Sequence, residues 1–296
     1  MNARRMAVGF VAAVLMGTGC GGDDDPGTVL TSAEFPAALV ALPDGGLLYG
    51  ERLTGRIRRV DANGVVEPDP VATVDVSTQG QRGLLGLAAE GERVFAAWTD
   101  VDQRLVVAQV APGSARVVWV GPDTTELANG GRLAFAPDGR LVIGIGDLQA
   151  PALVNDPNPV NGKLLALDAD AGPEQVPDVV SGGWNNPFAF AFTPTGDLWV
   201  ADNSPGEDPE RLTRGDGSGP VTELPTATAP SGLAATDGGD LLVCGYVSGQ
   251  LLRYEVVDGR AERRTVLADD CRLGVVVLDD GRIVYAAENS LHVLDP

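Results

Sequence analysis

The chain has 296 residues, 44% of them hydrophobic, and its 41 acidic and 21 basic side chains give a formal net charge of −20. This hydrophobic content can fill a core, which excludes a wholly disordered chain, and the negative charge argues against nucleic acid as a partner. The 39 glycines and 21 prolines favour an all-β protein with many turns. The single histidine, His292, excludes mechanisms that need several histidines.

The amino terminus has the pattern of an export signal. Two arginines precede the apolar run 7–16, which is too short to span a bilayer, and small residues then lead to Cys20. This pattern resembles a bacterial lipoprotein signal, which implies cleavage before Cys20 and lipidation of that residue. Gly17 departs from the pattern, since such signals usually have leucine there. The alternative is ordinary secretion, with Cys20 free or disulfide-bonded.

These features divide the chain into a signal peptide (1–19), a lipidated cysteine with a flexible tether (20–30) and a folded domain (31–296). The tether is expected because the segment after the cysteine is polar and has nothing to bury. The protein is expected to be a monomer that faces the periplasm or the cell surface. It would touch the membrane through its lipid anchor only.

The rest of the chain repeats one short pattern, a turn of Pro, Asp, Thr or Gly followed by an apolar strand. Examples are LPDGGLLYG (42–50), APDGRLVIGIG (136–146) and TPTGDLWVAD (193–202). The turn glycines, 42 to 57 residues apart, are Gly45, Gly91, Gly139, Gly196, Gly239 and Gly281. Six units of this length, each with several short strands, predict a six-bladed β-propeller. A β-sandwich is the competing architecture.

Two cysteines remain if Cys20 is lipidated. Cys244 and Cys271 lie near the starts of the last two repeats. An oxidising compartment allows one disulfide between them, and the alternative is two buried thiols.

Propellers bind ligands at the mouth of the central channel, where the loops converge, so polar residues between strands are the candidate site residues. They are Gln81, Arg82, Asn129, Arg132, Asp147, Asn185, Asn186, Asp202, Asn203, Glu207, Asp208 and Glu210. Among them Asp202, Asp208 and Glu210 form an oxygen-rich group that suits a hard cation such as calcium. The alternative is that these three are solvated turn residues.

Four segments together resemble the glucose/sorbosone dehydrogenase family. They are GQRGLLGLA (80–88), NGGRLAFAPDGRL (129–141), NNPFAFAFTPTGDLWVAD (185–202) and APSGLAATDGGDLLV (229–243). The resemblance implies a six-bladed propeller, periplasmic or secreted, that oxidises sugars with pyrroloquinoline quinone (PQQ) and calcium. It also implies that Asn186 contacts the quinone and that Gln81 lines the substrate site, where Asn129 is a second substrate-binding candidate.

The chain departs from the family pattern at the active-site positions. The family motif H-x-G-G-R-L, whose histidine is the general base, begins here with Ala128. The arginine of G-x-R-N-P is Asn185, and the R-x-R-D-V cluster that holds the quinone carboxylates reads CRLGV (271–275). Loss of a general base typically costs about 10²–10⁴-fold in rate. Loss of guanidinium groups removes charge-assisted contacts to an anionic cofactor.

Three functions follow from this reading. The first is a lipoprotein propeller that binds a small-molecule or glycan ligand and whose quinone-dependent sugar oxidation is lost or weakened. The second is an active aldose sugar dehydrogenase, dependent on PQQ and calcium, with a rebuilt pocket. The third is a calcium-dependent lactonase or hydrolase, whose metal ligands would be Asn129, Asp147, Asn186 and Asp202.

Overall fold

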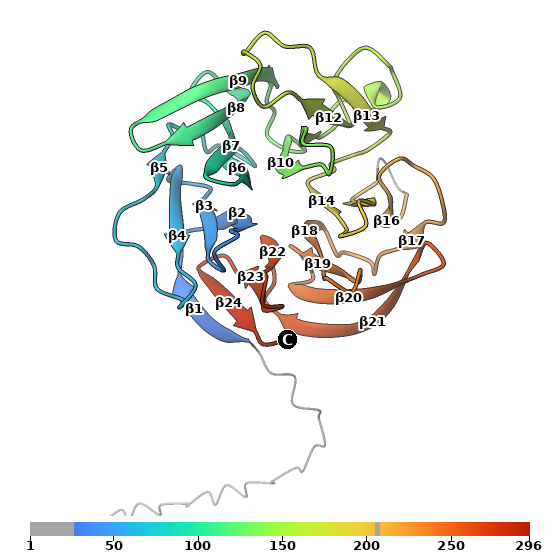
Figure 1. Ribbon diagram of the computed structural model, residues 1–296. Coiled ribbons are helices and arrows are strands. Elements are labelled where there is room, and N and C mark those ends of the chain that lie inside the picture. The colour runs from blue at the N-terminus through green and yellow to red at the C-terminus, as the bar shows by residue number, and fades with distance from the viewer. Residues whose placement is uncertain (1–26, 205–207) are drawn as a thin grey trace, which may run out of the picture.

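The computed structural model describes residues 27–204 and 208–296. Their strands form six four-stranded antiparallel sheets around a central axis (Figure 1). This confirms the six-bladed β-propeller, and the β-sandwich is excluded. The predicted signal peptide 1–19, Cys20 and Glu207 lie outside the described residues. Within the described part, no helix combines the length and the apolar character needed to cross a bilayer.

The first three blades follow one another along the chain, each beginning with its innermost strand. Blade 1 contains β2 (Pro36–Ala41), β3 (Leu47–Glu51), β4 (Arg56–Val60) and β5 (Ala72–Thr73). Blade 2 contains β6 (Leu84–Glu90), β7 (Arg93–Thr99), β8 (Arg104–Ala111) and β9 (Ser114–Asp123). Blade 3 contains β10 (Gly130–Phe135), β11 (Leu141–Ile145), β12 (Lys163–Leu167) and β13 (Asp178–Gly182), with the 3₁₀ helix η1 (Pro151–Leu153) between β11 and β12.

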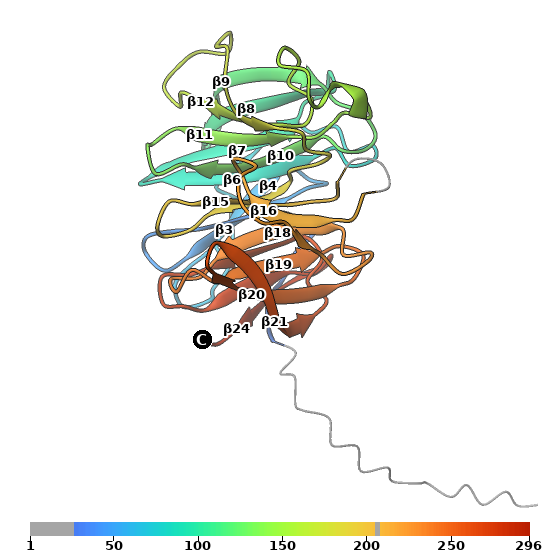
Figure 2. The ribbon, with the colours of Figure 1, turned by 90° about the vertical axis from the view of Figure 1, so that its right-hand side faces the viewer.

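The last three blades complete the ring, which Figure 2 shows after a 90° turn. Blade 4 contains β14 (Ala189–Phe192), β15 (Leu198–Asp202), β16 (Arg211–Arg214) and β17 (Thr222–Glu223). Blade 5 contains β18 (Pro230–Ala235), β19 (Leu241–Gly245), β20 (Gln250–Val257) and β21 (Arg260–Asp269). Blade 6 contains β22 (Gly274–Val277), β23 (Ile283–Ala286), β24 (Ser290–Leu294) and, as its outer strand, β1 (Thr28–Ser32).

Blade 6 joins the two ends of the described chain. β1 pairs antiparallel with β24, so that Val29 lies opposite His292. β1 begins at Thr28, so the propeller starts three residues before the predicted boundary and includes the end of the segment 20–30 expected to be a tether.

The six turn glycines used to count the repeats each join the first and second strands of a blade. All six have a positive φ, from 58° at Gly91 to 89° at Gly196. Residues with a Cβ rarely adopt this left-handed conformation, which explains why glycine recurs at the turn.

The core consists of apolar layers between neighbouring blades. Between blades 2 and 3, for example, Phe95 and Leu105 pack with Leu141 and Leu165. The described residues contain six such clusters, one for each pair of adjacent blades around the ring. Sheets packed face to face in this way hold the inner strands, and the loops that precede them, in fixed positions around the axis.

Candidate functional site

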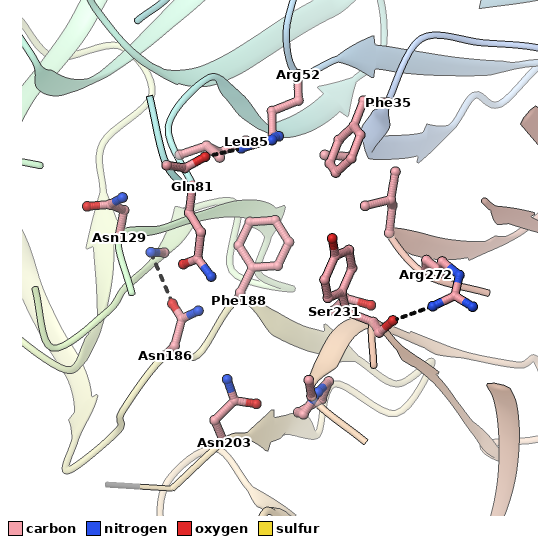
Figure 3. A pocket seen from close by; sticks show the side chains of 17 residues that line it. Phe35, Arg52, Gln81, Leu85, Asn129, Asn186, Phe188, Asn203, Ser231 and Arg272 are labelled. Carbon is pink, nitrogen blue, oxygen red and sulfur yellow. Dashed lines mark hydrogen bonds between the residues drawn. The ribbon is translucent and has the colours of Figure 1, made fainter. Parts of the chain in front are cut away.

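A cavity of about 250 Å³ lies at the mouth of the central channel (Figure 3). All six blades contribute to it, mainly through the loops that enter the inner strands. Its apolar side chains include Phe35, Leu85, Phe188 and Leu273. Its amide side chains are Gln81, Asn129, Asn186 and Asn203. A pocket with an apolar wall and a few convergent polar groups is the usual form of a small-molecule site.

β-Bulges in the inner strands help to shape this cavity. The ladder of β2 with β3 skips Ala37, that of β6 with β7 skips Leu85, and that of β18 with β19 skips Ser231. All three skipped residues line the cavity. A bulge redirects a side chain and ends regular pairing, so these irregularities place side chains at the channel mouth.

Two arginines are the charged residues of the lining. They are Arg52, from the loop after β3, and Arg272, from the loop before β22. Among the described residues that line the cavity there is no aspartate, glutamate or histidine. Sequence reasoning treated Arg272 only as part of the altered 271–275 cluster and missed Arg52.

Gln81 and Asn129, the predicted substrate-binding residues, both line the cavity but differ in what they can offer. Gln81 Oε1 accepts a hydrogen bond from the Ala128 backbone N–H at 2.8 Å, which leaves the amide nitrogen for a ligand. Asn129 is 2% exposed. Its Oδ1 accepts from the Thr125 N–H at 2.7 Å and its Nδ2 donates to the Thr125 carbonyl at 2.9 Å. Asn129 therefore holds its own loop, and its geometry does not suit a substrate contact.

Asn186, the predicted cofactor-binding residue, lines the cavity, and hydrogen bonds with Gly130 and Asp202 fix its position. Its Oδ1 accepts from the Gly130 N–H at 3.1 Å. Its backbone N–H donates to Asp202 Oδ1 at 2.8 Å. Asp202 is fully buried and also accepts from the Asn185 N–H and from Arg211 Nη2, both at 3.1 Å. Asp202 thus positions the segment that carries Asn186.

The structure does not bring the three predicted cation ligands, Asp202, Asp208 and Glu210, together in one cluster. Asp202 is occupied as described, and the two oxygens of Glu210 accept from the Thr228 and Ala229 N–H groups at 2.8 and 2.9 Å. Asp208 is exposed. Within residues 27–204 and 208–296, no group of three His, Cys, Asp or Glu side chains could hold a metal ion. The carboxylates are used to order neighbouring loops, an outcome that polar loop residues commonly have.

The ligand set considered for a hydrolase is not brought together either. Asn129 and Asn186 line the cavity, but Asp147 and Asp202 do not. Asp147 is buried and accepts from Asn185 Nδ2 at 3.0 Å and from the Gln149 N–H at 2.8 Å.

Two further candidates, Arg82 and Arg132, are buried and support the cavity from outside it. Arg82 donates through Nε and Nη2 to the hydroxyl and the carbonyl of Thr124, at 2.9 and 2.8 Å. Arg132 lies on the inner strand β10. It donates to carbonyls of three other blades, those of Phe188 at 3.2 Å, Ser231 at 2.8 Å and Leu273 at 3.3 Å.

The Arg132 guanidinium is a buried cation. Its carbon atom lies 4.5 Å from the centre of the Phe188 ring. Burial lowers the pKa of Arg132 to about 10. No carboxylate in the described part of the chain forms an ion pair with it. Arg132 therefore ties three cavity walls together and places a positive charge close to them.

A disulfide joins Cys244, in β19, to Cys271, beside the cavity residue Arg272. Of the two alternatives left open by the sequence, the structure has the bonded pair. The bond connects blade 5 to the loop that enters blade 6.

The lone histidine lies away from the cavity, in β24 of blade 6. His292 stacks on Tyr285 with ring centres 5.0 Å apart, and its Nε2 lies 2.9 Å from Ser290 Oγ.

Arg52, Asn203 and Tyr246 occupy the same position in three different repeats. Each follows the second strand of its blade, in GLLYGER, DLWVADN and DLLVCGY respectively. All three line the cavity. Aligning the repeats on their turn glycines would have identified this position as a shared site.

The larger part of the chain matches one protein family. The family model for glucose / sorbosone dehydrogenases matches residues 33–216, more than half of the chain. The chain belongs to the glucose/sorbosone dehydrogenase family. A search of curated proteins found no match.

Solved structures of glucose/sorbosone dehydrogenase type have the same fold. A Thermus thermophilus protein, provisionally assigned as an oxidoreductase (glucose dehydrogenase), is 28% identical with a TM-score of 0.75, over 90% of this chain and 98% of that one. The PQQ-bound aldose sugar dehydrogenase of Streptomyces coelicolor is 24% identical, with a TM-score of 0.74 over 90% and 96% of the two chains. The apo-form of the soluble aldose sugar dehydrogenase of Escherichia coli is 20% identical, with a TM-score of 0.75 over 90% and 99%. The last two support the fold alone.

Proposed function

We propose that this protein is an exported, lipid-anchored member of the glucose/sorbosone dehydrogenase family that binds a small-molecule or glycan ligand at the channel mouth. In this proposal, quinone-dependent sugar oxidation is lost or greatly weakened. The export signal and Cys20 support the anchored location. The observation that carries the functional part is the absence of a proton acceptor in the described lining of the cavity.

Oxidation of a sugar hydroxyl needs a group that accepts the hydroxyl proton. By the resemblance, Ala128 stands where the family has its histidine base. The described lining offers no imidazole or carboxylate in its place. Burial raises the pKa of the Tyr246 phenol, which removes the one remaining candidate near neutral pH.

The cavity also fits PQQ poorly. By the resemblance, the family contacts this quinone with an arginine at the position of Asn185 and holds its carboxylates with arginines at the positions of Cys271 and Leu273. The Asn185 side chain is bonded to Asp147, and Leu273 presents an alkyl group. The cavity keeps Arg52 and Arg272, and Arg272 is already paired with Asp270 at 2.8 Å. One unpaired guanidinium does not match several cofactor carboxylates, so the residues of this cavity support no reaction step through PQQ.

The described residues contain no cluster of carboxylates that could bind calcium. Ca²⁺ takes six to eight oxygen ligands, usually with several carboxylates. The carboxylates of Asp202 and Glu210 are instead occupied by backbone N–H groups. This disfavours a calcium-dependent lactonase as well as the calcium-dependent oxidoreductase.

The second candidate is an active PQQ- and calcium-dependent aldose sugar dehydrogenase with a rebuilt pocket. It is favoured by Gln81 and Asn186, which match the family pattern and line the cavity. A direct test is reduction of an artificial dye by the purified protein with PQQ, Ca²⁺ and a panel of aldoses. We expect no sugar-dependent rate above that of free PQQ. A rate that requires protein, quinone and sugar together would establish the second candidate.

Quinone binding without oxidation is tested separately, by the unfolding temperature. A ligand that binds only the native state must stabilise it. We expect PQQ with Ca²⁺ to leave the unfolding temperature unchanged at concentrations that saturate an active dehydrogenase measured in parallel.

A further inference from the structure

The cavity is cationic although the chain is strongly anionic. The formal net charge is −20, yet the charged side chains of the described lining are the two arginines, Arg52 and Arg272. Arg132 adds a third guanidinium against the cavity wall, bonded only to carbonyl oxygens. A concave site lined with one sign of charge concentrates ligands of the opposite sign.

Arg52 is fixed in place with one edge unused. Its Nη1 donates to the Gly80 carbonyl at 2.8 Å and to the Arg82 carbonyl at 3.1 Å. Its guanidinium carbon lies 4.4 Å from the centre of the Phe35 ring. Nε is buried and has no acceptor among the described residues. Nε is therefore out of reach of a ligand, but Nη2 also has no acceptor among the described residues and can donate a charge-assisted hydrogen bond to a ligand carboxylate.

Arg52 has no carboxylate partner among the described residues, unlike most of the exposed arginines. Ten arginines of the described part form ion pairs with Asp or Glu: Arg56, Arg59, Arg93, Arg104, Arg140, Arg211, Arg214, Arg253, Arg272 and Arg282. Arg52 is partly buried and has none. A buried cation without a counter-ion is costly, and a ligand carboxylate would remove that cost.

No negatively charged side chain of the described cavity lining neutralises Arg52. Tyr246, which also lines the cavity, donates its hydroxyl to Glu288 Oε1 at 3.2 Å. Glu288 does not line the cavity. Arg272 donates through Nη1 to the Tyr246 carbonyl at 2.9 Å and through Nε to Asp270 at 2.8 Å. The Arg272 guanidinium adds positive charge to the cavity, and the paired Asp270 carboxylate partly neutralises that charge.

Other side chains of the lining offer groups suited to hydroxyls. Asn203 lines the cavity, and its amide nitrogen, which has no acceptor among the described residues, can donate to a ligand hydroxyl. Gln81 can donate through its amide nitrogen, since its oxygen is already bonded to the Ala128 N–H. Figure 3 shows Phe188 between the Gln81 side and the Arg272 side of the cavity, as an apolar surface for a small ring. The volume of about 250 Å³ suits one sugar unit.

We propose that the cavity binds a sugar acid, a single polyhydroxylated unit with one carboxylate, in preference to the neutral sugar of the same size. The carboxylate would bond to Nη2 of Arg52, and hydroxyl groups would bond to the amide groups of Asn203 and Gln81. This inference rests on the proposed function, that of a ligand-binding propeller, and names the class of ligand.

The test is calorimetric titration of the purified full-length chain with matched pairs of ligands. Glucuronate is compared with glucose, and gluconate with sorbitol, at low and at high ionic strength. We expect the acid of at least one pair to bind tenfold or more tightly than its neutral partner, with an affinity that falls as salt is added. PQQ is titrated separately, because its carboxylates could use the same arginine.

Three variants locate the site. Arg52→Gln should weaken sugar-acid binding at least tenfold and leave any neutral-sugar binding unchanged. Arg52→Lys keeps the charge and should also weaken binding, because an ammonium cannot bond the Gly80 and Arg82 carbonyls and present a second nitrogen to the ligand in the same geometry. This variant serves if Arg52→Gln does not fold. Arg140→Gln, which removes an exposed arginine outside the cavity lining, is the matched control and should bind normally.

The outcomes separate the inference from the proposed function. Equal or tighter binding of the neutral sugars would overturn the inference and leave a ligand-binding propeller. Absence of binding by all four carbohydrates, or full binding by a folded Arg52 variant, would also overturn it. Quinone-dependent oxidation of the neutral sugars would instead overturn the proposed function.

Discussion

Gln81 and Ala128 are joined at the rim of the cavity: Gln81 Oε1 accepts the Ala128 backbone N–H at 2.8 Å. The bond links the loop that enters blade 2 to the loop that enters blade 3. Ala128 has a φ of 53°, in the left-handed region that alanine seldom adopts and that asparagine and histidine adopt more readily. The backbone at this position therefore suits a histidine better than the alanine that the chain carries.

The first prediction is that Ala128→His folds normally and does not by itself produce sugar oxidation. The backbone accepts histidine, but Asn185 and Leu273 remain in place of the arginines expected for a quinone. The measurement is dye reduction with PQQ, Ca²⁺ and aldoses. Ala128→Asn, which also suits the left-handed region but supplies no base, is the matched control. A sugar-dependent rate in the histidine variant, absent from the asparagine variant, would show that the quinone site is intact.

The second prediction concerns Arg132. Replacing it with Met removes a buried guanidinium and leaves the carbonyls of Phe188, Ser231 and Leu273 without their donor. We expect the free energy of unfolding to fall by about 3 kcal/mol, the scale for removing one member of a buried charged network. Urea denaturation measures this. A change below about 0.5 kcal/mol would mean that the three carbonyls find other partners.

The third prediction concerns Tyr254, whose buried hydroxyl has no hydrogen-bond partner among the described residues. Tyr254→Phe should stabilise the protein by roughly 1 kcal/mol at neutral pH, because an unsatisfied buried hydroxyl is removed. Tyr49→Phe is the matched control. Arg58 hydrogen-bonds the buried Tyr49 hydroxyl, so this substitution should destabilise.

The same tyrosine gives a pH dependence. Burial raises the pKa of Tyr254 from 10.0 to about 12 in the folded state. The unfolded state therefore loses this proton first, so the free energy of unfolding is unaffected by this group below pH 10 and falls as the pH rises to about 12. Tyr254→Phe should make the fall in stability over this pH range less steep. An unchanged slope would contradict the raised pKa.

The fourth prediction is that a chelator leaves the unfolding temperature unchanged. The carboxylates of Asp202 and Glu210 are occupied by backbone N–H groups rather than by a cation. Glu210→Gln should nevertheless lower the free energy of unfolding by about 1–2 kcal/mol, because charge-assisted bonds to Thr228 and Ala229 are weakened. Destabilisation by the chelator, reversed by added Ca²⁺, would point to a metal site.

The fifth prediction concerns the bond between Cys244 and Cys271, which are 27 residues apart. Opening it by reduction should cost about 3.5 kcal/mol in unfolding free energy, as expected for a loop of this length. The measurement is the urea midpoint with and without reductant. The Cys244→Ala/Cys271→Ala variant, insensitive to reductant, is the control.

The fold could be predicted because its signal is local and repeated. A turn glycine with positive φ, followed by an alternating strand, occurs in every blade, so six weak signals reinforce one another. The start of the propeller at Thr28 was missed because β1 has no turn motif of its own and is defined only by its pairing with β24.

The site was predicted only in part. Gln81 and Asn186 line the cavity as expected. Asp202 and Glu210 were assigned to a cation because a sequence shows that a carboxylate is present but not which N–H groups the folded chain brings to it. The cavity position of Leu85 depends on a β-bulge, a break in pairing that the alternation of side chains does not reveal.

The pairing of β1 with β24 also determines when the molecule can finish folding. Leu30 and Leu291 belong to the same apolar cluster, although they come from opposite ends of the described chain. Ring closure must therefore wait until the last strand has emerged from the ribosome, because no earlier segment completes blade 6. Until then the first strand has no partner strand to pair with. We expect residues 290–294 to be needed to close the ring, so that their deletion yields an open ring that is sensitive to proteases.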